Sequence, residues 1–146
     1  MFRHLHHWSY AMKTDETCFE QADFQELYNR HGIAIASFLA RKYLQGDSEQ
    51  ARKIAKWAFR HLRRNPKLYD RKYKLRPLLF TIAANRAIKC AASIHTVAIA
   101  AEYNVLPRDI RGLIKPVRKG GWICPGFSPR FNDPNYWPSF VPLCEV

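Results

Sequence analysis

Cationic side chains and aromatic rings alternate along one stretch of the sequence, and this combination suits the chemistry of nucleic acid. Residues 41–89 hold 15 basic residues and three acidic ones, so this stretch carries the whole formal charge of +12. Lys and Arg neutralise phosphates, and aromatic rings stack on unpaired bases. A polyanion is therefore the expected partner, although a ribosome-associated or merely basic protein would have a similar overall charge.

The helix expected from residue 47 to residue 64 and the connector after it, up to residue 75, hold most of these side chains. Trp57 falls off the apolar stripe of its helix, so it should be at least partly exposed. The alternative interpretation is a solvated charged face whose rings pack inside. The residues of this segment expected to contact DNA are Arg60, Arg63, Arg64, Lys67, Tyr69, Arg71, Tyr73 and Lys74.

A second candidate for reading DNA is the segment TVAIAAEYNVLPRDIRGLIK at residues 96–115. A helix-turn-helix needs a small residue where its helices cross and a residue that tolerates positive φ at the turn, and Ala100 and Asn104 occupy these places. The positions expected to be buried are Ile99, Tyr103, Val105, Ile110 and Leu113. Arginine on the second helix can pair with guanine in the major groove, and the outward residues expected to contact DNA are Arg108, Arg111 and Lys115. An ordinary helical hairpin with surface charges is the alternative.

Capping signals and apolar periodicity predict an all-α protein with a basic helical domain at residues 21–92. The first helix runs from Asp23 to about residue 44, and the second begins at Asp47 with Gln50 as the reciprocal partner of a capping box. Asn65–Pro66 ends the second helix, and Pro77 lies in the first turn of the third. A short break at Ser93–His95 should then separate this domain from the helix-turn-helix at residues 93–116.

The two ends of the chain differ from this central part. Residues 1–20 are expected to form a flexible or loosely docked extension. Residues 117–146 are rich in proline, glycine and aromatic residues, which excludes a helix there but also differs from ordinary disorder. We expect them to form an extended arm that packs on its own domain or on a partner. The aromatic residues of this arm are Trp122, Phe127, Phe131, Tyr136, Trp137 and Phe140.

Several function classes find no support in the sequence. There is no long apolar run for a membrane span and no secretory signal, so we expect a cytoplasmic, nucleoid-associated protein. Cys18, Cys90, Cys124 and Cys144 are expected to be free thiols; the lesser alternative is a zinc site that uses Cys124 or Cys144 with His4, His6 or His7. No catalytic, nucleotide-binding or metalloprotease motif is present, so neither an enzyme, a cofactor, a metal nor a small-molecule substrate is expected.

Residues 21–89 resemble region 2 of the extracytoplasmic-function class of bacterial sigma factors. The segment FQELYNRHGIAIASFLARKYL is similar to the first helix of that region, and SEQARKIAKWAFRHLRRN is similar to the helix that ends in an aromatic-rich LRLWRN. The best match is RPLLFTIAANRAIK, which resembles the family's RAWLFRIARNLAID almost position for position. In that match Leu78 stands where tryptophan is usual, whereas Ala83, Asn85, Ala87 and Ile88 agree.

The resemblance implies a three-helix domain that binds the clamp of bacterial RNA polymerase and captures a flipped promoter base with the loop around residues 67–74. It also implies that Asn85 and Lys89 lie on a helix that faces DNA. The residues at the implied polymerase contact are Arg52, Lys53, Ile54, Lys56 and Trp57; the basic residues among them replace acidic ones of the family. The expected function is therefore a sigma-factor-like transcription regulator, of a kind that would suit a phage or mobile element. The alternatives are a polymerase-binding modulator and a basic nucleic-acid-binding protein without sequence preference.

Overall fold

Helices form most of the structure, a computed structural model that describes residues 13–116, 122–126, 129–133 and 136–138. The prediction of an all-α protein is confirmed, apart from two short strands that pair antiparallel. The helices are α2 (Asp15–Glu20), α3 (Phe24–Lys42), α4 (Ser48–Arg64), α5 (Leu75–Tyr103) and α6 (Pro107–Ile110). The shorter elements are the 3-10 helices η1 (Pro66–Leu68) and η2 (Pro129–Asn132) and the strands β1 (Lys115–Pro116) and β2 (Trp122–Ile123).

Side-chain caps set the start of the two helices that form the first hairpin. The Asp23 carboxylate accepts a hydrogen bond from the backbone N–H of Glu26 at 3.3 Å, and the Asp47 carboxylate accepts one from the N–H of Gln50 at 3.1 Å. Each bond satisfies a backbone donor that the first turn leaves free. The expectation that Gln50 returns a reciprocal bond in a capping box is wrong. Its side chain turns into the core and donates to Cys90 Sγ at 3.3 Å.

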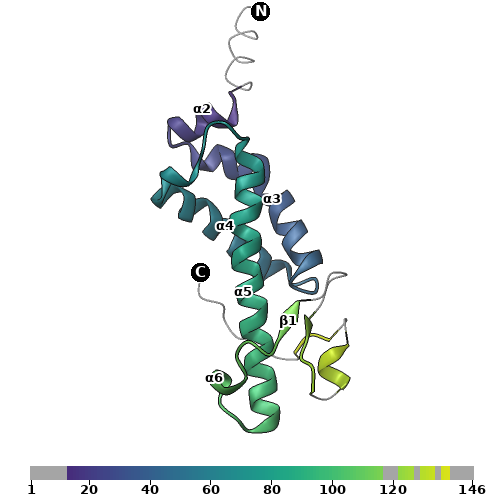
Figure 1. Ribbon diagram of the computed structural model, residues 1–146. Coiled ribbons are helices and arrows are strands. Elements are labelled where there is room, and N and C mark those ends of the chain that lie inside the picture. Colours follow the sequence, from purple (N-terminus) through teal and green to yellow (C-terminus); the bar gives the residue numbers. More distant parts are fainter. Residues whose placement is uncertain (1–12, 117–121, 127–128, 134–135, 139–146) are drawn as a thin grey trace, which may run out of the picture.

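The third long helix, α5, continues through the break that the sequence predicted at Ser93–His95. No glycine or proline interrupts the chain between residues 78 and 103, and the Thr96 hydroxyl donates to the carbonyl of Ala92 at 2.7 Å within the helix. The helix ends at Asn104, which adopts the expected left-handed conformation with φ 54° and ψ 44°. At 1.5 Å per residue, α5 is about 43 Å long, and Figure 1 shows it running along most of the molecule.

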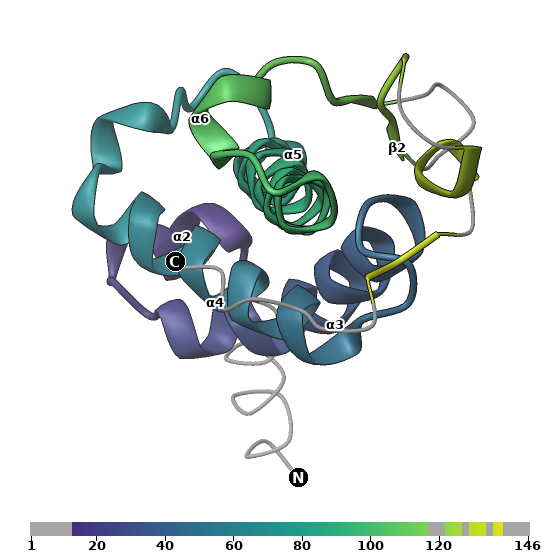
Figure 2. The ribbon, with the colours of Figure 1, turned by 90° about the horizontal axis from the view of Figure 1, so that it is seen from below.

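The core lies where α3 and α4 pack on the first half of α5. Figure 2, seen nearly along α5, shows α3 and α4 on one side of this helix. Both α4 and α5 bury alanines in this core. Leu79 and Ala83 are fully buried as expected, whereas Leu78 and Ile82 are partly exposed. The fully buried residues of α3 and α4 are Leu27, Ile35, Leu39, Ala51, Ile54, Ala55, Ala58 and Leu62.

Residues near both ends of the chain contribute to the core as well. The expected flexible extension at residues 1–20 is wrong for its last part, because α2 is capped by Thr14 and buries Cys18 and Phe19. Residues 1–12 lie outside the described residues. In the C-terminal part Trp122 and Phe131 are buried, so the expected packing of the arm on its own domain is confirmed for the described residues. Phe127 and Phe140 lie outside them.

Candidate nucleic-acid interface

A groove between α4 and α5 brings aromatic, amide and cationic side chains together. Its volume is about 390 Å³. Asn85 and Lys89, which the resemblance placed on a DNA-facing helix, are exposed and line this groove, and so does Trp57. The remaining lining residues are His61, Leu68, Ile82 and Arg86. Such a mixture of flat rings, an amide and cations can hold a nucleobase together with its phosphate.

Two rings of α4 form a stack at this groove. The indole of Trp57 and the imidazole of His61 are one helical turn apart, with ring centroids at 4.6 Å and planes at 16°. The guanidinium of Arg86, from α5, lies 5.1 Å from the centre of the Trp57 ring, within the range of a cation–π contact. Its Nε is buried and has no hydrogen-bond partner among the described residues.

A second hollow continues from the first along α5 and shares Lys89 with it. Its volume is about 440 Å³, and it lies between the later turns of α5 and the segment around α6. Ser93 and Thr96 of α5 line it, and Arg111 lines it from beyond α6. Lys89 therefore connects two hollows, each of which carries at least one further cation: Arg86 in the first and Arg111 in the second.

The connector between α4 and α5 holds residues with different environments. Lys67, Tyr73 and Lys74 are exposed as expected. Tyr69 is only 9 % exposed and packs edge-on against Phe19 of α2 with ring centroids at 4.9 Å, so the expectation that it stacks on a base is wrong. Burial raises the pKa of its hydroxyl. Arg71 pairs with Glu20 at 2.6 Å, which leaves it less available to a phosphate.

The three arginines near the end of α4 are exposed but do not line the α4–α5 groove. Arg60 and Arg63 instead line a hollow between α4 and α3, and Arg64 lies at the last position of α4. Arg60 and Arg63 therefore lie away from the Trp57–His61 stack, whereas Arg64, three residues after His61, follows the same face of α4 as the stack. The sequence placed Arg60, Arg63 and Arg64 in one DNA-binding set, and the structure places the first two on the α3 side of α4.

The helix-turn-helix prediction is wrong in its second helix. Helix α6 spans only Pro107–Ile110, because Arg111 is extended at φ −60° and ψ 132° and Gly112 adopts φ 92°. Ile99, Ala100 and Ile110 are buried as expected. Tyr103, Val105 and Leu113, which were expected to be buried, are 42 %, 42 % and 46 % exposed. A single turn cannot present a row of side chains to a major groove. Arg108 and Lys115, the latter in β1, are both exposed.

The residues predicted to contact polymerase do not share one surface. Ile54 is fully buried, so it cannot belong to an interface. Trp57 lies in the groove with α5, whereas Arg52 and Lys56 line the hollows between α4 and α3. Lys53 is 3.9 Å from Glu49 in an i,i+4 pair. Of the predicted polymerase contacts, only Arg52 and Lys56 remain together, on the α3 side of α4, as candidate residues for a protein contact.

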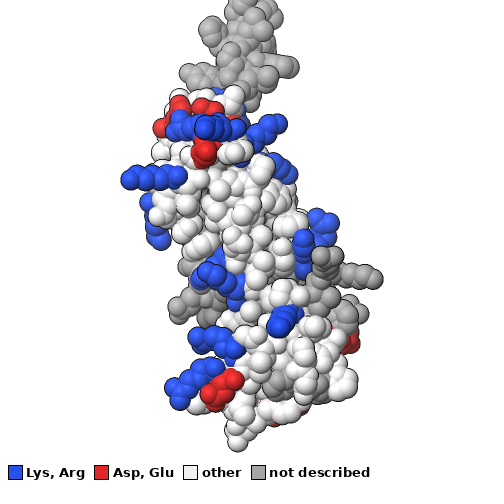
Figure 3. Space-filling view, viewed as in Figure 1, with Lys and Arg blue, Asp and Glu red and all other residues white. Residues whose placement is uncertain are grey.

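Charge is distributed unevenly over the face drawn in Figure 3. Acidic side chains gather mainly over α2, while Lys and Arg are scattered along the remaining length. Within the described part of the chain no cluster of His, Cys, Asp and Glu could hold a metal, and no helix is long and apolar enough to span a membrane. The histidines of the zinc alternative and Cys144 lie outside the described residues.

The thiols depart from the sequence expectation at one position. Cys18 and Cys124 are free and buried, and burial raises the pKa of the Cys124 thiol. Cys90 is disulfide-bonded, so the expectation of a free thiol is wrong there.

Sequence reasoning missed two residues of the α4–α5 groove, His61 and Arg86. The spacing of Trp57 and His61 was a usable signal, because residues four apart lie on the same helix face. Arg86 could not be found in this way, since its place beside Trp57 depends on how α4 and α5 pack.

Comparison with known proteins found no family model, no curated protein and no solved structure that matches this chain.

Proposed function

We propose that this protein is a sigma-factor-like transcription regulator that binds promoter DNA chiefly through the groove between α4 and α5. The observation that carries the proposal is the Trp57–His61 stack, with its ring centroids at 4.6 Å, in a groove that also contains Asn85 and Lys89. An aromatic stack beside an amide and a cation offers a base a flat surface, a hydrogen-bonding group and a partner for its phosphate.

The preferred form of DNA is an unpaired strand, as in a melted promoter. A base inside a duplex cannot join the Trp57–His61 stack, because neighbouring base pairs cover both faces of that base. Helix α6 is too short to act as a recognition helix, which removes the main support for sequence reading in a duplex. Lys89 and Arg111 then serve as successive phosphate contacts along the two connected hollows.

The polymerase part of the proposal depends on the resemblance of residues 21–89 to sigma region 2. The three long helices α3, α4 and α5 cover this stretch, as the resemblance requires, but three packed helices also occur in many other proteins. A basic nucleic-acid-binding protein without sequence preference is the second candidate. The net charge of +12 and the sequence-tolerant nature of aromatic stacking favour it.

The test of the DNA contact is the affinity for a fluorescent promoter duplex that carries an unpaired bubble, measured by anisotropy at fixed salt. Stacking contributes about 1–3 kcal/mol per base, so Trp57→Ala should weaken binding about fivefold or more. Lys89→Ala should weaken binding and flatten the salt dependence, whereas Arg41→Ala, an exposed cation at the end of α3, should do neither. Equal affinity of Trp57→Ala and the unchanged protein would refute the proposed site.

The polymerase contact needs a separate measurement. The protein should co-elute with core RNA polymerase in size-exclusion chromatography, and the housekeeping sigma factor should compete with it. Binding to polymerase that already holds its sigma factor would instead make the protein an accessory modulator. DNA binding without any polymerase binding, and with equal affinity for unrelated sequences, would establish the second candidate.

A further inference from the structure

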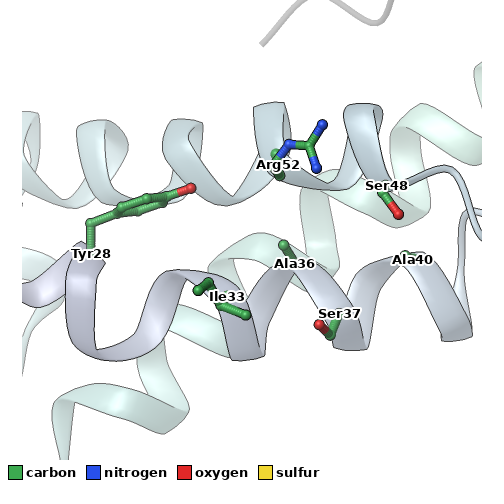
Figure 4. A pocket seen from close by; sticks show the side chains of 7 residues that line it. All are labelled: Tyr28, Ile33, Ala36, Ser37, Ala40, Ser48 and Arg52. Carbon is green, nitrogen blue, oxygen red and sulfur yellow. The ribbon is translucent and has the colours of Figure 1, made fainter.

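A second groove lies on the other side of α4, between α4 and α3. It consists of two hollows of about 180 and 550 Å³ that meet at Tyr28. Figure 4 shows the smaller hollow, with Ser48 and Arg52 reaching it from α4 and the ring of Tyr28 extending from α3 toward α4. Ala36 and Ala40 form its apolar floor, and both are buried.

Tyr28 occupies its place because residue 32 has no side chain. A Cβ on Gly32 would lie 2.6–2.8 Å from three atoms of the Tyr28 ring, which is closer than any real contact. The ring can therefore lie against the backbone of α3, one turn from its own position, and its edge contacts Phe59 with centroids at 5.3 Å. At the rim of the smaller hollow Ile33 is 78 % exposed, an unusual degree for so large an apolar side chain.

One wall of this groove is cationic along its whole length. Its cations are Arg52, Lys56, Arg60 and Arg63, which recur on α4 at steps of three and four residues. Among the described residues none of the four forms an ion pair, and the ion pair present on α4 joins Lys53 to Glu49. Asp23, at the far end of the groove, is already engaged by Lys13 at 3.6 Å. The groove extends from Ser48 to Arg63, a rise of about 22 Å along α4.

We propose that the α3–α4 groove binds an acidic amphipathic helix of a protein partner. The groove has the length of about four helical turns. An apolar face would cover Tyr28 and Ile33, and carboxylates would pair with the cations of α4, in the manner of a helix that docks in a groove. Charge complementarity of this kind selects the partner and its orientation. The proposal goes beyond the nucleic-acid contact and places α4 between two binding sites.

A nucleic-acid strand fits this groove less well than the groove beside α5. One face of the Tyr28 ring lies against α3 at Gly32, and the exposed aliphatic side chain of Ile33 offers neither charge nor a hydrogen bond to a nucleotide. The same side chain suits the apolar stripe of a helix. The cations alone would accept either polyanion, whereas the apolar floor favours the protein.

The probe is a fluorescein-labelled peptide of about 15 residues with Leu at every third or fourth position and Glu elsewhere, titrated with the full chain and followed by anisotropy. A peptide with Lys in place of Glu is the control for charge. We expect saturable binding of the acidic peptide and no saturable binding of the control peptide with Lys in place of Glu. Charge reversal by Arg52→Glu with Arg60→Glu should weaken it about tenfold or more.

Three further variants separate the two grooves. Ile33→Ser should weaken peptide binding several-fold, whereas Leu106→Ser, at an exposed apolar residue after α5, should leave it unchanged. Gly32→Ala should also weaken it by displacing the Tyr28 ring, with circular dichroism used to verify folding. Trp57→Ala should reduce binding of the promoter bubble without affecting the peptide.

Several results would overturn this inference. One is the absence of saturable peptide binding. Another is full competition between the peptide and oligo-dT together with loss of both in Trp57→Ala, which would place the peptide in the α4–α5 groove. A dimer in sedimentation that dissociates on Arg52→Glu would assign the groove to a second copy of the chain. Binding of the promoter bubble is measured independently of binding of the peptide. A peptide that does not bind therefore leaves the proposed DNA contact intact, and a promoter bubble that does not bind leaves the proposed peptide contact intact.

Discussion

Acid should destabilise this protein through one buried histidine, His95. This residue lies in α5, is 2 % exposed, and is surrounded by rings of the C-terminal segments. Its imidazole is 6.0 Å from Trp122, 5.9 Å from Tyr136 and 5.5 Å from Trp137 between ring centroids. Its Nε2 has no hydrogen-bond partner among the described residues. Burial among these rings disfavours the charged form and lowers the pKa of His95 from 6.5 to about 4.

The pKa difference fixes both the direction and the size of the effect. Between about pH 6.5 and pH 4 the unfolded chain binds a proton at His95 that the folded state does not bind. The free energy of unfolding must therefore fall as the pH falls through this window. With 1.36 kcal/mol for each pKa unit, the loss at this site is about 2 kcal/mol at about pH 5 and about 3 kcal/mol at about pH 4.

The measurement is urea unfolding followed by tryptophan fluorescence, at about pH 7.5 and in steps down to about pH 4. Carboxylates also titrate over this range, so the test is the difference between the unchanged protein and His95→Gln, which keeps a polar side chain without the titration. His95→Phe provides a second non-titrating variant that keeps a ring among the rings. Both variants should lose less stability than the unchanged protein on acidification, by about 3 kcal/mol at about pH 4.

An equal pH dependence in all three proteins would refute this reasoning. It would mean that the imidazole accepts a proton in the folded state without cost, and therefore that the rings around His95 do not exclude water or an acceptor. A pH dependence that vanished in His95→Phe but persisted in His95→Gln would point to packing of the ring and not to its charge.

Three further perturbations test other parts of the structure by urea unfolding. Asp15→Ala should cost about 1–3 kcal/mol, because Asp15 accepts from His31 Nε2 at 2.8 Å and the imidazole is buried; an unchanged midpoint would refute this contact. Asn104→Ala should destabilise by about 1 kcal/mol and Asn104→Gly should not, because residue 104 has φ 54°; equal effects would contradict the left-handed cap. Phe131→Ala should cost about 3–5 kcal/mol if η2 packs as described, and a cost near zero would show that it does not.

The first hairpin could be predicted from the sequence because its signals are local. Asp23 and Asp47 cap their helices through bonds to residues three positions away, and the chain between the helices turns at Gly46 with φ 84°. The apolar stripes of α3 and α4 follow from the same short spacings. Residues within about one helical turn of each boundary are enough to predict where these helices begin and end.

The environment of Tyr69 could not be predicted, because it depends on contacts distant in sequence. In the connector this residue stands among Lys and Arg, which suggested an exposed ring. Its burial comes from Phe19, fifty positions earlier, in a segment whose helix the sequence did not indicate. The same cause separates Trp57 from Arg52 and Lys56, since packing against α3 and α5 decides on which side of α4 each groove lies.

The length of α5 was misjudged for a different reason. A break was expected at Ser93–His95, where polar residues interrupt the apolar pattern. Thr96 instead satisfies its hydroxyl within the helix, and His95 is covered by rings from residues 122–137. Conversely, the second helix of the predicted helix-turn-helix ends early because Gly112 takes a positive φ. Gly112, five residues after Pro107, was a local signal for this early end. The pattern of apolar residues suggested a longer helix and was given more weight.

The continuity of α5 fixes the positions of the two hollows beside it relative to each other. Asn85, Lys89, Ser93 and Thr96 recur at steps of three and four residues, so they follow one face of a single rigid helix. With a break at residues 93–95 the second hollow would lie on a separate element, free to rotate away from Trp57. In the continuous helix Lys89 stands at a fixed place between the ring stack and Arg111. In the proposed DNA contact, a strand whose base joins the Trp57–His61 stack would run along α5 toward the second hollow, and the short α6 would form a wall of that hollow.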